Sequence, residues 1–101
     1  MSKYKVASPE EIRDRISEAE EARVGRRIEA IVSEYIAPAM QEGLNEVTID
    51  INKEHRMKYL VERLGEEEVM YRFGDAGYEV TISEHGVLPS RHVVREVTLE
   101  W

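Results

Sequence analysis

Apolar residues recur at intervals of three and four in the first part of the chain, which is the period of an α-helix. Ser8, Pro9 and Glu11 provide a capping box with a proline at the first helical position, so the helix begins there. Gly43, a residue suited to a left-handed C-cap, ends it. The apolar stripe changes phase near Gly25. Its members are Ile12, Ile16, Ala19, Val24, Ile28, Ile31, Val32, Tyr35, Ile36, Ala39 and Met40.

This helix is longer than the domain to which it belongs. Residues 9–42 span about 50 Å, whereas a domain of about 100 residues has a radius of gyration of about 13 Å. Either the helix breaks near Gly25, or its first half lies against another subunit. We favour the second alternative. The expected contact residues between copies are Ile12, Ile16, Ala19 and Arg23. Pro38 has no backbone donor and predicts a kink near the end of the helix.

After Gly43 the apolar period changes from helical to alternating. Val47, Ile49 and Ile51 alternate with polar residues and predict a half-buried strand. A second helix follows, with Asn52 as its expected N-cap, and Gly65 ends it. The remaining expected elements are a short helix at 66–73, a turn at 74–77, a strand at 78–83, a loop at 84–90 and a strand at 93–101.

These elements predict an α+β fold in which helices cover one face of a small, mostly antiparallel three-stranded sheet. The last two strands form a hairpin, and the place of the first strand is left open. Arg95 falls on the apolar face of the last strand. The chain has 101 residues, the size of one domain, which we place at residues 8–101 after a flexible tail of residues 1–7.

The charge balance narrows the range of partners. Fourteen Lys and Arg against 21 Asp and Glu give a net charge of −7, which repels phosphate backbones and disfavours nucleic acid. The chain has no cysteine, which excludes disulfides, thiolate zinc sites and cysteine nucleophiles. Apolar runs are only a few residues long and the start lacks the pattern of a signal peptide, so we expect a soluble protein with no membrane partner.

No motif for catalysis, metal binding or cofactor binding stands out. No helix carries two of the histidines His55, His85 and His92 at i and i+4, the spacing that places both on one face. None of the serines lies on the tight turn that exposes a nucleophile. Gly74 and Gly77 match a bare GxxG pattern, but it lies between a helix and a strand and contains an acid. We therefore expect no enzyme, no metal and no cofactor.

One group of basic residues is a candidate ligand site. If the sheet folds as expected, a small anion pocket lies between the hairpin and the short helix. Its residues are Arg72, Arg91, His92 and Arg95. The alternative is that these arginines lie on a polar rim without a ligand. A less favoured hypothesis is a small enzyme that uses His85, Arg91 and His92 around the last loop.

Four segments carry a likeness to a known group of proteins. They are IAPAMQEG at 36–43, LVERLG at 60–65, GYEVTI at 77–82 and VTLEW at 97–101. In these segments the chain resembles small proteins encoded by tailed bacteriophages, in which a long N-terminal helix ends at glycine and the last strand ends in tryptophan. The likeness runs from about Arg26 to the end, and residues 66–76 depart from the tighter form of the pattern.

The resemblance implies a phage protein that acts by binding and brings no catalytic residues with it. Together with the acidic charge and the long helix, it predicts a non-enzymatic accessory protein of the host-defence inhibitor type. Such a protein binds, blocks or sequesters a host component as a homo-oligomer in the bacterial cytoplasm. A virion decoration protein is the alternative. The expected partners are a second copy of the chain and a host protein or small anionic ligand.

Overall fold

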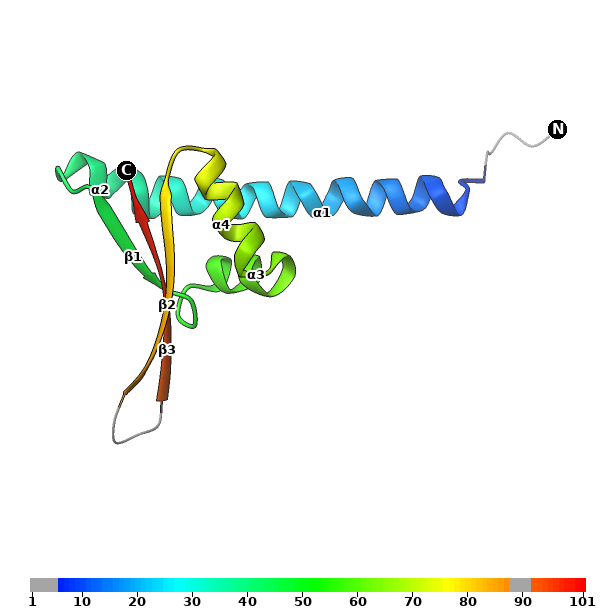
Figure 1. The fold of residues 1–101 in the computed structure, drawn as a ribbon. Coiled ribbons are helices and arrows are strands. Elements are labelled where there is room, and N and C mark those ends of the chain that lie inside the picture. The colour runs from blue at the N-terminus through cyan, green and yellow to red at the C-terminus, as the bar shows by residue number, and fades with distance from the viewer. Residues whose placement is uncertain (1–5, 88–91) are drawn as a thin grey trace.

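The computed structural model describes residues 6–87 and 92–101 and confirms the α+β class (Figure 1). Residues 9–41 form a long N-terminal helical rod. One strand and two short helices follow it, and a β-hairpin comes last. The elements in chain order are α1 (Pro9–Ile31), η1 (Val32–Ile36), α2 (Ala37–Gln41), β1 (Glu46–Asp50), α3 (His55–Leu64), α4 (Glu66–Asp75), β2 (Glu79–Val87) and β3 (His92–Glu100).

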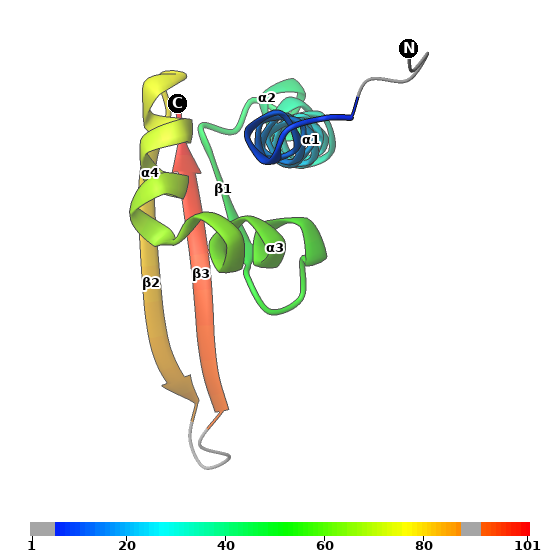
Figure 2. The same cartoon turned by 90° about the vertical axis from the view of Figure 1, so that its right-hand side faces the viewer.

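The three strands form one antiparallel sheet in the order β1-β3-β2. The expected hairpin of the last two strands is confirmed, and the first strand, left open by the sequence, pairs with the other side of β3. Val97 therefore lies between Ile49 and Ile82 in the central strand. Figure 2 views the sheet from its helical side, with α3 and α4 in front of the strands and α1 seen nearly end-on beside β1.

The hydrophobic core lies between the inner face of the sheet and the helices. The largest wholly buried side chain is Phe73 of α4, whose ring meets Tyr78 edge-on, and Tyr78 in turn meets Trp101. Trp101 also donates its indole N–H to the carbonyl of Leu44, at 3.1 Å. The buried apolar residues are Val24, Ile31, Ile36, Ala39, Ile49, Ile51, Met57, Leu60, Val61, Val69, Phe73, Val97 and Leu99.

Helix α1 runs through Gly25 without a break, so the alternative of a broken helix is wrong. Its beginning is as predicted, because the Ser8 hydroxyl accepts from the backbone N–H of Glu11 at 3.1 Å. The helix leaves the rest of the domain and makes the molecule 68 Å long, with a radius of gyration of 18.1 Å (Figure 1). That radius exceeds the value of about 13 Å for a compact chain of this size.

The irregularity predicted at Pro38 takes the form of a π-helix, η1, immediately before it. The N–H of Ala37 donates to the carbonyl of Val32, five residues back, and not to the usual partner four residues back. Pro38 has no N–H and its ring crowds the preceding turn, so a wider turn relieves that contact. The extra residue also rotates the buried face, which passes from Ile31 directly to Ile36.

Three local predictions need correction. The N-cap of α3 is Glu54, whose carboxylate accepts from the N–H of Arg56, while Asn52 belongs to the turn after β1. Gly74 lies inside α4, and Gly77, with a φ of 105°, makes the turn. Strand β2 continues to Val87, so residues 84–87 are strand and not loop, and residues 88–90 lie outside the described part.

Candidate functional site

The first part of α1, residues 9–19, belongs to the longest run of exposed residues in the described part of the chain, and we call it the protruding segment. Every one of its residues is exposed, including Ile12 at 46% and Ile16 at 61%. Within the described residues, the first bond from α1 to another element comes from Glu20, just after this segment. Ile12, Ile16 and Ala19 therefore form an apolar stripe that nothing in the described chain covers.

This stripe lies on a different side of α1 from the side that faces the domain. The stripe continues to Arg23, which is exposed, whereas the next residue, Val24, is completely buried. Consecutive residues of an α-helix point about 100° apart, because one turn contains about 3.6 residues. The phase change in the sequence thus marks two faces of one straight helix: one packs against α3 and α4, and the other is left open.

Ion pairs fix the remainder of α1 to the two short helices. Glu20 pairs with Arg63 of α3, and Glu21 accepts two bonds from Arg72 of α4, at 2.8 and 2.9 Å. Arg27 of α1 also makes a cation–π contact with Tyr59 of α3, because its guanidinium lies 3.7 Å from the centre of the Tyr59 ring. These contacts hold the helix at the angle from which the protruding segment extends.

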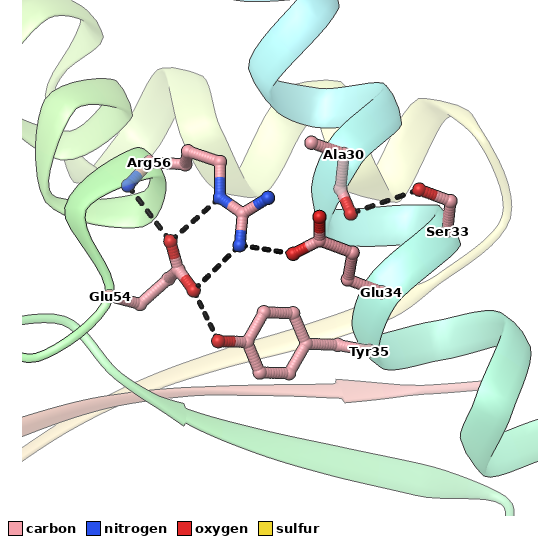
Figure 3. A network of polar contacts seen from close by, with 6 residues as sticks. All are labelled: Ala30, Ser33, Glu34, Tyr35, Glu54 and Arg56. Atoms are coloured by element: carbon pink, nitrogen blue, oxygen red, sulfur yellow. Dashed lines mark hydrogen bonds and ion pairs between the residues drawn. The ribbon is translucent and has the colours of Figure 1, made fainter.

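A buried carboxylate joins the rod to the start of α3 (Figure 3). Glu54 is only 9% exposed and accepts three bonds from Arg56: from its backbone N–H at 3.0 Å, from Nε at 2.9 Å and from Nη2 at 3.1 Å. The Tyr35 hydroxyl donates to the same carboxylate, and Arg56 also pairs with Glu34. Tyr35 and Glu34 both come from the π-helix, which turns them toward α3.

The protonation states of this network follow from its geometry. The hydrogen bonds from the Arg56 guanidinium lower the pKa of Glu54 to about 2, against the opposing effect of burial. The same carboxylate raises the pKa of the Tyr35 hydroxyl, and the pKa of Arg56 is raised by its two carboxylate partners. Each group therefore keeps its charge state at neutral pH, as expected of a structural clamp more than of a proton-transfer site.

The predicted anion-pocket residues have partners of their own where the structure describes them. Arg72 binds Glu21 and Glu68, and these bonds raise the pKa of its guanidinium. Arg95 lies on the inner face of β3, as predicted, and pairs with Glu66 at the first turn of α4. Each of the two arginines thus binds a different acid in the first turn of α4. Arg91 and the side chain of His92 lie outside the described residues, so the pocket stays a prediction.

The described residues offer no enclosed site. Residues 6–87 and 92–101 enclose no pocket, and their His, Asp and Glu side chains form no group of three that could hold a metal ion. His85 lies exposed on the outer face of β2, beside Val94 of β3. No helix in this part of the chain is both long enough and apolar enough to cross a membrane.

The Glu54 network was not among the predicted sites. Its signal in the sequence was the acid at the beginning of the α3 helical pattern, followed two residues later by an arginine. Tyr35 was assigned to the apolar stripe, and its hydroxyl needed a partner at the edge of the core. The contact spans 19 residues of sequence and depends on the π-helix, which periodicity alone does not indicate.

The fold and the exposed stripe define a small α+β protein whose N-terminal helix extends beyond its own domain. No protein-family model, curated protein or solved structure matches the chain.

Proposed function

We propose that the chain is a non-enzymatic binding protein that acts as an oligomer, assembled through the protruding segment. The observation that carries the proposal is the exposure of Ile12 and Ile16 on a helix that extends beyond its own domain. Most of the stability of a helix in a protein comes from packing of its apolar face, which residues 9–19 lack within the described chain. A second copy would supply the missing packing surface.

The charges along α1 favour an antiparallel pair of copies. In a two-fold arrangement with Ile16 of one copy opposite Ala19 of the other, Ile12 meets the stem of Arg23. Glu11 of one helix, at the side of the stripe, then lies at the level of Arg23 and Arg26 of its partner. Such opposite charges fix the direction of pairing more than they add affinity.

The expected affinity is modest. Four isoleucines in a dimer contribute about 1.5–3 kcal/mol each when buried, and association costs at least about 4 kcal/mol. The remainder is at most about 8 kcal/mol, which corresponds to a dissociation constant of about 1 µM or weaker. Association should therefore be followed over a concentration series from the nanomolar to the high micromolar range.

Sedimentation velocity on wild type and on Ile12→Ser/Ile16→Ser tests the proposal. We expect wild type to associate with rising concentration and the variant to stay monomeric. The matched control is Met40→Ser/Leu44→Ser, which removes two apolar side chains of similar exposure, 44% and 52%, elsewhere on the surface. A wild-type chain that remains monomeric at high micromolar concentration, or an equal loss in the control, would contradict it.

For the biological setting we propose an accessory protein of a tailed bacteriophage that blocks or sequesters a host component, as the resemblance implies. Affinity capture from an infected bacterial lysate, with wild type and the Ile12→Ser/Ile16→Ser variant as baits, tests this setting. A host protein retained by wild type but lost with the variant would support it. Detection of the chain in purified virions would favour the decoration protein instead.

A further inference from the structure

The outer face of the sheet, opposite the helices, carries acids and no lysine or arginine among the described residues, and its edge at β2 is open. Among the described residues, the alternation of side chains places five acids on this face and neither lysine nor arginine. The acids are Glu46, Asp50, Glu79, Glu96 and Glu100. Three of them form one row across all three strands, Glu46–Glu100–Glu79.

The hydrogen-bond pattern identifies the backbone groups on the open edge. Ile51 donates to the carbonyl of Arg95 and Trp101 to that of Asn45, so odd-numbered residues of β3 bond β1 and its even-numbered residues bond β2. By the same register, the backbone N–H and C=O groups of Val80, Ile82 and Glu84 point away from β3. Among residues 6–87 and 92–101, no group bonds to them, and Figure 2 shows α4 in front of the upper part of β2 but no strand alongside this edge.

An open edge of this kind accepts a further strand. Natural sheets usually protect a long edge with lysine, proline or a bulge, because unpaired backbone groups bind other chains. Strand β2 runs for nine residues and contains neither proline nor lysine. Val80 and Ile82 lie only half-buried on the inner side of the edge, and so they offer apolar contact to a guest strand.

We propose that the β2 edge binds an extended, basic segment of a partner protein as a fourth, antiparallel strand. The inference rests on the proposed function of a binding protein and names the chemistry of its target. In an antiparallel pair, residues that face each other project on the same side of the sheet. Guest residues bonded to Val80 and Ile82 are therefore apolar, and the guest residues opposite Glu79 and Thr81, on the acidic face, are lysine or arginine.

Charge decides between this occupant and a second copy. A copy paired through β2 about a two-fold axis would extend the same outer face and bring five more carboxylates onto it. Each chain already carries a net charge of −7, so that arrangement concentrates like charges. A guest strand that places lysines on this face replaces the repulsion between carboxylates with attraction. That attraction speeds the association of the two proteins at low salt.

Binding of synthetic peptides to the full chain, followed by fluorescence anisotropy, tests the proposal. The probe is acetyl-KVKIKVK-amide, and its controls are EVEIEVE and a block sequence KKKKVVI of the same composition. We expect binding of the first peptide only. N-methylation of its valines and isoleucine should abolish binding, whereas N-methylation of its lysines should leave it, because only the apolar residues bond to the edge.

A matched pair of protein variants locates the site. Glu79 and Glu46 are both exposed and both flank Glu100, but only Glu79 lies on the β2 edge. We expect Glu79→Lys to weaken peptide binding about fivefold and Glu46→Lys less than about twofold. Circular dichroism checks that both variants are folded.

Several outcomes would overturn the strand-addition proposal. They are equal binding of the block peptide, equal binding of the two N-methylated peptides, and equal effects of the two lysine variants. A change in sedimentation of Glu79→Lys without peptide would assign the edge to a second copy and also overturn it. Peptide binding by monomeric Ile12→Ser/Ile16→Ser would show that the edge works without the helix contact, so the two proposals are tested separately.

Discussion

The two parts of α1 are one continuous helix with two different surroundings. Residues 9–19 are exposed on every side, whereas residues 20–31 pack through Val24 and Ile31 and are held by ion pairs to α3 and α4. Both parts carry apolar residues at helical spacing. The comparison teaches that this spacing predicts the helix and its apolar face, but not whether the face is covered by the same chain or by another.

The sharpest test of the comparison is the same substitution in both parts. Ile31→Ala removes a completely buried side chain, and we expect it to lower the free energy of unfolding by about 3 kcal/mol. Ile16→Ala, at an exposed position, should change it by less than about 0.5 kcal/mol. Urea unfolding at low protein concentration measures both. A large effect of Ile16→Ala in the monomer would mean that its own domain covers the protruding segment.

The Glu54 network predicts an acid-sensitive attachment of the rod. The folded-state pKa of Glu54, about 2, lies below its ordinary value of 4.5, so its contribution is fully present above pH 4.5 and is lost as pH falls toward 2. The shift corresponds to at most about 3 kcal/mol. Urea unfolding at pH 7 and pH 3 should show a smaller loss of stability for Glu54→Gln than for wild type. Equal losses in the two proteins would show that other carboxylates control acid sensitivity.

The sequence was sufficient for the elements but not for their relations. The capping box at Ser8 and the left-handed glycine at Gly43 marked the two ends of the helical rod correctly. The place of β1 beside β3 could not be predicted from the sequence. The alternation of apolar and polar residues shows which face of a strand is buried, but not which strand lies next to it. β2 was predicted too short because Gly86, near its end, resembles a turn residue.

The candidate sites were harder to predict than the fold. The exposed stripe followed from one length comparison, which needs only the helical rise and the size of a domain. By contrast, one partner of Arg72 is Glu21, 51 residues earlier, and no local pattern indicates that pair. The free edge of β2 depends on strand order, so it became visible only when β3 was found in the centre.

A second pair of substitutions compares charges in the two regions. Arg72→Ala breaks the bond to Glu21, which joins α4 to α1, and the bond to Glu68 within α4, and we expect a loss of about 1 kcal/mol. Arg13→Ala, in the protruding segment, should have an effect near zero. Because exposed ion pairs are screened, the difference should shrink when salt is raised to about 1 M. A loss independent of salt would indicate packing of the arginine stem as the main cause.

The smallest expected effect concerns Gly25, at the boundary between the two regions. An added Cβ at this position meets no atom within 4 Å, and the residue lies inside a continuous helix. Gly25→Ala should therefore stabilise the chain by about 0.5–1 kcal/mol, since alanine loses less backbone entropy on folding. Thermal and urea unfolding measure the gain, with Ala22→Gly, at an exposed position three residues earlier, as a control expected to show the opposite sign. If Gly25→Ala is instead destabilising, the glycine has a conformation that alanine cannot adopt.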